Sequence, residues 1–183
     1  MIFTETYSIM KSILPFLPER TGKPRNSGLT MVMDKGLSVR EAEDFMSVGS
    51  EYTDFVKLGF GTSLITPALK EKIRIYKNAG VVPYFGGTLF EAFIIRDMFS
   101  EFVKYLDEYE IELVEVSDGS FEIEHSRKLD FINRLARRGS VISEVGSKKK
   151  EVVYTPEEWV AMMRSELDAG LSLIHISEPT RPY

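Results

Sequence analysis

The 183-residue chain contains no cysteine and only two histidines, His125 and His175. Without cysteine the protein has no disulfide, no thiolate nucleophile and no cysteine-bound metal. With two histidines, neither a serine–histidine–aspartate triad nor a zinc site built from several histidines is expected. No uncharged apolar run approaches the ~20 residues of a membrane span, and the N-terminal residues lack the small-residue cleavage site of a signal peptide. We therefore expect a cytoplasmic protein.

An excess of positive charge is also lacking, because 23 lysines and arginines stand against 28 aspartates and glutamates, a net charge of −5. Proteins that bind DNA or RNA through the phosphate backbone are usually basic, so we expect no nucleic-acid partner. The composition is 43 % apolar and 11 % aromatic. This is typical of a globular protein and excludes a disordered one.

A repeated unit runs through most of the chain, consisting of a short apolar run, a glycine-rich turn and an amphipathic stretch. The apolar runs are rich in β-branched and aromatic residues, as buried parallel strands are, and they cover residues 29–33, 52–59, 81–85, 111–116 and 140–145. The stretches between them carry helix-start signals, among them capping boxes at Ser38 and Thr155. This alternation predicts an α/β protein with a parallel sheet. No G-x-G-x-x-G motif opens the first helix, so a dinucleotide site is not expected.

Two α/β architectures fit this pattern, an open doubly wound sheet and a (β/α)₈ barrel. A barrel usually needs ~250 residues, and this chain of 183 residues is about three βα units short. The residues alone leave the two architectures open.

Charged residues stand near the ends of four apolar runs, where a buried strand should be apolar. These residues are Asp34, Lys57, Glu115 and Glu144. Burying an unpaired charge costs several kcal/mol, and any one of these charges alone is best explained by a structural ion pair. The same placement on four strands favours a functional site, because the carboxyl ends of parallel strands form the functional face of α/β folds. Mixed signs there suit a site that holds a metal and an anionic substrate together.

Glycine-rich turns with hydroxyl groups follow two of these strands and precede helices. Backbone N–H groups and helix N-termini bind anions, so the turns supply candidate substrate-binding residues, namely Gly59, Gly61, Thr62, Ser63, Gly86, Gly87 and Thr88. A basic run, 148–150, lies just beyond the fifth strand and begins with Lys148. We expect Arg134, Arg137 and Arg138 to belong to a solvated helix face instead.

Five segments together resemble the phosphosulfolactate synthase family, which adds sulfite to phosphoenolpyruvate. The segments are GLTMVMDKG, DFVKLGFGTS, FGGTLFE, VEVSDGS and SEVGSK, in the family's order and spacing from about Lys23 to Gly170. The resemblance implies a (β/α)₈ TIM barrel of which this chain holds about the first five βα units, with 1–22 as an N-terminal extension and 23–170 as a partial barrel domain. It also implies Mg²⁺ as cofactor and a sulfonate product that is a precursor of coenzyme M.

The resemblance further implies roles for individual residues. Asp34, Glu115 and Glu144 are the expected Mg²⁺ ligands, with Glu144 also among the catalytic residues. Lys148 is the candidate proton donor, and Lys35 and Lys57 would hold the anions phosphoenolpyruvate and sulfite. Ser117 and Asp118 join the substrate-binding set, with Asp118 either an orienting residue or simply a turn residue. The family pattern leaves the oligomeric state open, a homo-oligomer included.

Two alternatives to this function stay open. One is another barrel lyase or aldolase that acts on a small phosphorylated acid, and the other is a non-catalytic barrel homologue linked to stress tolerance. The charged strand ends favour the enzyme. The last segment, LSLIHISEPTRPY, departs from the family pattern and resembles translated sequencing-adapter or vector sequence. We therefore expect residues 171–183 to be a non-native tail.

Overall fold

Six parallel strands, hydrogen-bonded in chain order, form one curved sheet. The structure is a computed structural model that describes Phe16 and residues 20–146 and 154–177. The strands are β1 Met31–Asp34, β2 Phe55–Leu58, β3 Val82–Phe85, β4 Leu113–Val116, β5 Ser140–Gly146 and β6 Leu173–Ser177. Every strand predicted from the sequence is present within or overlapping its predicted range.

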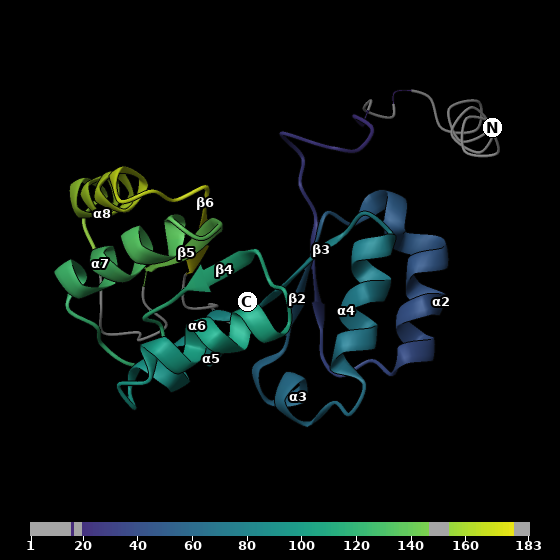
Figure 1. Ribbon diagram of the computed structural model, residues 1–183. Coiled ribbons are helices and arrows are strands. Elements are labelled where there is room, and N and C mark those ends of the chain that lie inside the picture. Colours follow the sequence, from purple (N-terminus) through teal and green to yellow (C-terminus); the bar gives the residue numbers. More distant parts are fainter. Residues whose placement is uncertain (1–15, 17–19, 147–153, 178–183) are drawn as a thin grey trace, which may run out of the picture.

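Helices connect consecutive strands and lie on the outer side of the sheet (Figure 1). They are α2 Val39–Gly49, α3 Phe60–Ile65, α4 Leu69–Asn78, α5 Gly87–Ile94, α6 Phe99–Glu108, α7 His125–Ala136 and α8 Pro156–Asp168, with the 3₁₀ helix η1 Ser50–Tyr52 after α2. In Figure 1, α2 and α4 lie on the side of β1–β3, and α7 and α8 on the side of β5 and β6. Six consecutive parallel strands with outer helices form a partial (β/α) barrel, which confirms the predicted barrel class.

Local sequence signals fix where the helices begin. The Ser38 hydroxyl accepts from the N–H of Glu41 at 3.2 Å, and the Glu41 carboxylate accepts from the N–H of Ser38 at 2.8 Å. Thr155 and Glu158 make the same reciprocal pair at the start of α8. Both predicted capping boxes are therefore confirmed, and each satisfies N–H groups that a helix start leaves without a partner.

The pleat of the strands sorts their side chains between two environments. Residues paired across a parallel sheet point to the same side, and successive residues alternate. Lys57 is paired with Met33 and Tyr84, so these side chains lie on the inner, concave face, opposite the helices. Glu115 and Glu144 also lie on the inner face, by the pairing of Glu115 with Ile142 and the two-residue period of β5.

The apolar core fills the space between the sheet and the outer helices. Its strand residues include Val56, Leu58, Phe85, Val114 and Val116, and helix residues such as Leu89, Phe90, Phe102, Leu106 and Ile132 pack against them. Phe90 contacts Phe102 and Phe131 edge to face, with ring centroids 5.5 Å apart in both pairs. Core packing therefore explains the helical apolar pattern between Leu89 and Tyr109, although the structure divides it into α5 and α6.

The sixth strand, β6, lies within the segment expected to be a non-native tail. It pairs with β5 from Leu173 to Ser177. The segment is apolar enough to form this strand whatever its origin, so the pairing does not bear on whether residues 171–183 are native. None of the helices in the described ranges is long and apolar enough to cross a membrane.

Candidate active site

A buried ion pair occupies the inner face of the sheet. The ammonium Nζ of Lys57 lies 2.9 Å from Glu115 Oε1 and 2.7 Å from Glu115 Oε2. The Lys57 side chain is 13 % exposed and that of Glu115 is fully buried. The two residues come from β2 and β4, with β3 between them, so the pair spans the concave surface. Two of the predicted catalytic and metal-binding residues are thus in direct contact.

Glu115 also fixes the start of α5. Its Oε2 accepts from the backbone N–H of Gly87 at 2.6 Å. A Cβ atom at Gly87 would lie 2.3 Å from Cβ of Ser117, so this close approach requires glycine. Burial alone would raise the pKa of Glu115, but hydrogen bonds from His175, Lys57 and Gly87 outweigh burial and hold the pKa below its usual value. Glu115 is therefore a carboxylate in the folded protein.

Glu144 stands beside Glu115 at the end of β5. Ligand atoms of Glu115, Glu144 and His175 lie within 4.8 Å of one another. Mg²⁺ prefers oxygen ligands and commonly takes one or two protein carboxylates together with water and substrate. The two buried glutamates fit that requirement. His175 offers a third ligand atom, but Mg²⁺ prefers oxygen to imidazole nitrogen, so we base the candidate metal site on the glutamates.

The turn after β4 is held by a glutamate from α5. Glu91 Oε1 lies 2.6 Å from the Ser117 hydroxyl, which donates to it, and accepts from the N–H of Gly119 at 2.9 Å. The Ser117 hydroxyl also lies 3.2 Å from Glu144 Oε2. Glu91 was not among the predicted site residues. Its carboxylate accepts hydrogen bonds from the backbone of the turn, and Ser117 links it to Glu144 on the inner face.

A lysine from α7 holds the same turn from the other side. Lys128 Nζ donates to Asp118 Oδ1 at 2.9 Å and to the carbonyl of Glu144 at 2.8 Å, and it lies 2.9 Å from Glu166 Oε1. The Lys128 side chain is 2 % exposed. Asp118 is thus both a turn residue and a partner of Lys128. The structure places it in a supporting position next to Ser117.

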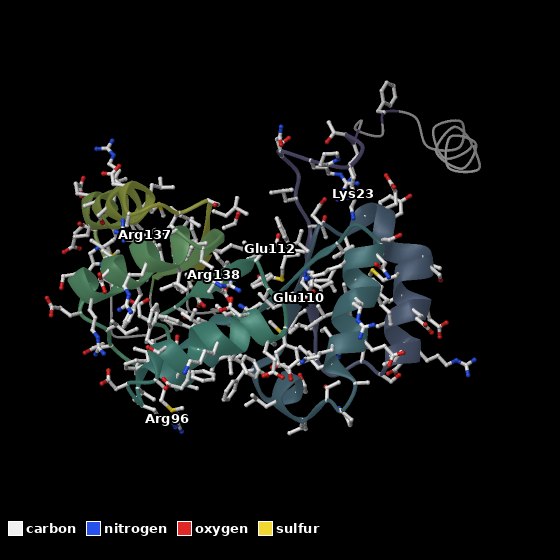
Figure 2. The ribbon with its side chains drawn as sticks, viewed as in Figure 1. Lys23, Arg96, Glu110, Glu112, Arg137 and Arg138 are labelled. Carbon is white, nitrogen blue, oxygen red and sulfur yellow. The ribbon has the colours of Figure 1, made fainter. Side chains whose placement is uncertain are left out.

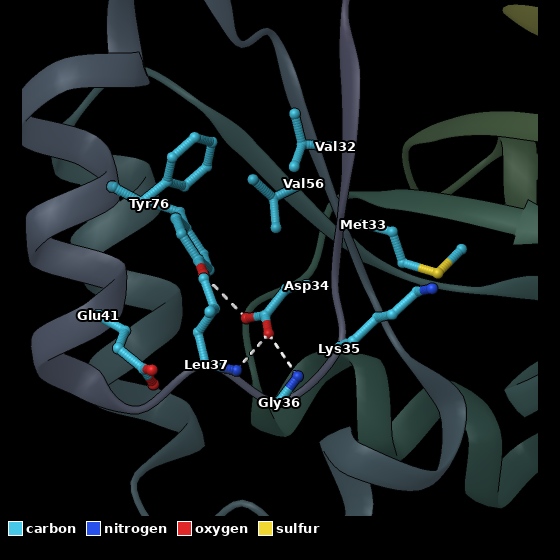
Figure 3. Close-up of a pocket in the computed structure, with 10 residues that line it drawn as sticks. Val32, Met33, Asp34, Lys35, Gly36, Leu37, Glu41, Val56 and Tyr76 are labelled. Atoms are coloured by element: carbon cyan, nitrogen blue, oxygen red, sulfur yellow. Dashed lines mark hydrogen bonds between the residues drawn. The ribbon is translucent and has the colours of Figure 1, made fainter.

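Asp34 is separated from these residues. Its carboxylate lies on the helix-facing side of β1 and accepts hydrogen bonds from the N–H groups of Gly36 and Leu37 and from the hydroxyl of Tyr76, each 2.8 Å long (Figure 3). A fourth donor, Nζ of Lys72, also lies 2.8 Å from it. Burial raises the pKa of Asp34, but the bonds from these four donors outweigh it and hold the pKa low. Because Asp34 lies on the opposite side of the sheet from Glu115 and Glu144, we leave it out of the metal site proposed below.

Lys35, the next residue, extends away from the Asp34 carboxylate toward the side on which Met33 lies (Figure 3). It is exposed. A cavity of about 470 Å³ lies beside Asp34, between β1 and helices α2 and α4, with Val32, Phe45 and Tyr76 among its lining residues. Its position behind the sheet separates it from the inner-face charges.

The two glycine-rich turns have partners within the protein. The Thr62 and Ser63 hydroxyls donate to the carbonyls of Gly59 and Phe60 at 3.3 and 2.9 Å. Gly86 packs against Lys57, because a Cβ atom there would lie 2.8 Å from Lys57 Cε. Gly61 faces open space and Thr88 is exposed. The turns therefore shape the inner face, and Gly61 and Thr88 stay accessible.

Three arginines lie in the last turn of α7 or just after its last residue, Ala136. Arg134 and Arg137 are exposed, and Arg138 pairs with Asp107 at 2.6 Å. Figure 2 labels Arg137 and Arg138 at the end of α7, on the outer surface. Arg134 and Arg137 therefore lie on a solvated helix end, whereas Arg138 follows the helix and is held by Asp107 and the carbonyl of Ile111. Lys148 lies outside the described residues.

Comparison with known proteins settles the family. A family model described as (2R)-phospho-3-sulfolactate synthase (ComA) matches residues 18–179. The chain belongs to the phosphosulfolactate synthase family. It is 38 % identical over 162 residues to phosphosulfolactate synthase of Methanothermobacter thermautotrophicus, 36 % over 156 residues to that of Bacillus subtilis, and 39 % over 154 residues to that of Methanocaldococcus jannaschii.

These matches cover 86 %, 84 % and 81 % of this chain, and 63 %, 62 % and 61 % of the three relatives in the same order. The chain thus spans about three fifths of the length of the phosphosulfolactate synthases that it matches. A solved xylose isomerase-like TIM barrel/4-hydroxyphenylpyruvate dioxygenase fusion protein superimposes with a TM-score of 0.47 at 14 % identity, over 80 % of this chain and 26 % of that one. That likeness is too low to bear on function.

Proposed function

We propose that the full-length protein is a phosphosulfolactate synthase, which adds sulfite to phosphoenolpyruvate with Mg²⁺ and gives (2R)-O-phospho-3-sulfolactate. The observation that carries this proposal is the inner-face cluster of Lys57, Glu115 and Glu144, at the carboxyl ends of parallel strands in a chain of this family. The expected substrates are small anions, and the proposal places the reaction in the cytoplasm.

The reaction needs positive charge where negative charge grows. The sulfur lone pair of sulfite attacks the methylene carbon of phosphoenolpyruvate and forms a carbon–sulfur bond. The electrons of the carbon–carbon double bond move toward the carboxylate as an enolate, and the central carbon then takes a proton. Both reactants are anions, so a preorganised cation in a partly dry site lowers the barrier by stabilising the enolate.

Different residues of the chain would bind the metal, supply positive charge, contact the substrate and donate the proton. Glu115 and Glu144 would hold Mg²⁺, which supplies Lewis-acid stabilisation of the substrate carboxylate when bound. Lys57, positioned by its 2.7 Å contact with Glu115, provides fixed positive charge on the inner face. Lys35 adds a cation at the end of β1, while Gly61 and Thr88 offer backbone and hydroxyl contacts. Lys148, beyond the end of β5, is the proposed proton donor.

The proposal is tested with the full-length gene product, phosphoenolpyruvate, sulfite and Mg²⁺, followed by ³¹P NMR. We expect the phosphoenolpyruvate resonance to be replaced by that of a phosphorylated sulfonate, and the conversion to stop when a chelator removes Mg²⁺. Consumption of phosphoenolpyruvate without sulfite would favour a different lyase or an aldolase. No conversion under any of these conditions would contradict the proposal and favour a non-catalytic homologue.

A further inference from the structure

Tyr84 occupies the middle of the inner face and was not among the residues predicted to be functional. It lies on β3, paired with Lys57 of β2 on one side and Leu113 of β4 on the other. Its side chain therefore projects toward the same concave surface as Lys57 and Glu115. The residue is 2 % exposed.

The hydroxyl of Tyr84 differs from that of the other deeply buried tyrosine. Tyr76 donates its hydroxyl hydrogen to Asp34 Oδ2 at 2.8 Å. Among the residues that the structure describes, no hydrogen-bond partner is found for the Tyr84 hydroxyl, and the fully buried side-chain atoms without a partner are others, Ser143 Oγ and Glu166 Oε2. The Tyr84 hydroxyl is therefore not sealed off in the core, and its donor and acceptor positions are open to a ligand on the inner face.

The surroundings of Tyr84 indicate what the missing acceptor is. Lys57 is its neighbour across the sheet, and burial together with the charges of Glu115 and Glu144 raises the pKa of its hydroxyl, which is therefore a neutral donor. The charged groups of these neighbours are already engaged with one another or suited to a cation. A neutral phenol adds a hydrogen-bond donor to this site without adding a charge that would itself need a partner.

We propose that the Tyr84 hydroxyl donates a hydrogen bond to an oxyanion of the bound substrate, a carboxylate or phosphate oxygen. This rests on the proposed function only for the identity of the substrate, because any small oxyanion on the inner face would meet the same donor. Tyr84 is then a substrate-binding residue as well as a buried residue of the core cluster.

The matched variants Tyr84→Phe and Tyr76→Phe test this in the full-length protein. Each removes one buried phenol oxygen and keeps the ring. Calorimetric titration with phosphoenolpyruvate in Mg²⁺ should show affinity falling by about 10- to 100-fold in Tyr84→Phe, the loss expected for one hydrogen bond to a charged group, with the melting temperature close to wild type. Tyr76→Phe should bind as wild type does and melt at a lower temperature, because it leaves Asp34 Oδ2 short of a donor.

The outcomes separate this inference from the proposed function. Equal affinity of wild type and Tyr84→Phe for phosphoenolpyruvate would overturn the role of Tyr84 and leave the reaction intact. A melting temperature of Tyr84→Phe as low as that of Tyr76→Phe would also overturn it, by showing a structural partner. Binding of inorganic phosphate that depends on Tyr84, without turnover, would support the oxyanion contact and contradict the reaction. If wild type binds none of phosphoenolpyruvate, sulfite and phosphate, both are wrong.

Discussion

Replacement of Asp34 by asparagine should destabilise the protein without weakening metal binding. The side chains of Asp34 and Lys72 are each 2 % exposed, with Oδ2 and Nζ 2.8 Å apart. An asparagine can still accept from Gly36 and Leu37, but its amide N–H₂ then faces two donors, Lys72 and Tyr76. Lys72 keeps only the carbonyl of Leu37, at 2.8 Å. The ammonium is therefore left buried without its counter-charge.

Breaking a buried ion pair by removing one partner costs about 3–5 kcal/mol. We expect the lower end, about 3 kcal/mol, because the Leu37 carbonyl still accepts from Lys72. For a domain of 150–250 residues this corresponds to a fall in melting temperature of roughly 6–12 °C. Urea unfolding of the full-length protein measures the free energy directly. The double variant Asp34→Asn/Lys72→Met should lose less than the two single variants summed, since it removes both charges.

The loss of stability in Asp34→Asn should depend on pH, in the direction that the pKa shift of Asp34 determines. The pKa of Asp34 is lower in the folded protein than in the unfolded chain, so its contribution is present above the unfolded pKa of about 4 and is lost as the pH falls through the folded pKa. The stability difference between wild type and Asp34→Asn should thus be constant at neutral pH and shrink below about pH 4. An Asp34→Asn variant as stable as wild type but weakened in Mg²⁺ affinity would refute this reasoning and restore Asp34 as a metal ligand.

Three further predictions concern the turns, the proton donor and the C-terminal segment. Gly87→Ala should lower the free energy of unfolding by about 1–3 kcal/mol in urea titrations, because its Cβ meets Ser117 at 2.3 Å, whereas Gly61→Ala, with open space around it, should not. Lys148→Ala should lower kcat by ~10²–10⁴-fold in steady-state assays, and Lys149→Ala and Lys150→Ala should have little effect; equal losses in all three would mean a diffuse attraction of anions. Genomic sequencing beyond codon 170 should show a reading other than residues 171–183, and a matching genomic sequence would show that the segment is native.

The periodic features of the fold were predictable from the sequence, because they depend on local rules. Short β-branched runs gave the first five strands, and reciprocal Ser-x-x-Glu and Thr-x-x-Glu patterns gave two helix starts. The position of Asp34 was not predictable in this way. It stands near the end of a strand as Glu115 and Glu144 do, but the pleat turns it to the helix side, and only the register with β2 reveals this.

The contacts of four residues could not be predicted from the sequence, because each residue has the sequence pattern of an ordinary helix-surface or core residue. Lys72, Glu91 and Lys128 sit on amphipathic helices, where a charged residue normally faces solvent, yet their long side chains reach back to the sheet. Tyr84 lies in an apolar strand and has the pattern of a core aromatic. Only the three-dimensional contacts show that the first three are paired and that the hydroxyl of Tyr84 has no partner within the described ranges.

The central claim is that the charges on the inner face carry the chemistry of this family. Comparison of kcat/KM for Glu115→Gln and Glu112→Gln, in the full-length protein with phosphoenolpyruvate, sulfite and Mg²⁺, tests it most directly. Both residues belong to the β4 region, but Glu115 is buried against Lys57, and Glu112 is exposed before the strand begins (Figure 2). The account predicts a fall of ~10²-fold or more for Glu115→Gln and no change for Glu112→Gln. A folded Glu115→Gln enzyme as active as Glu112→Gln would contradict it.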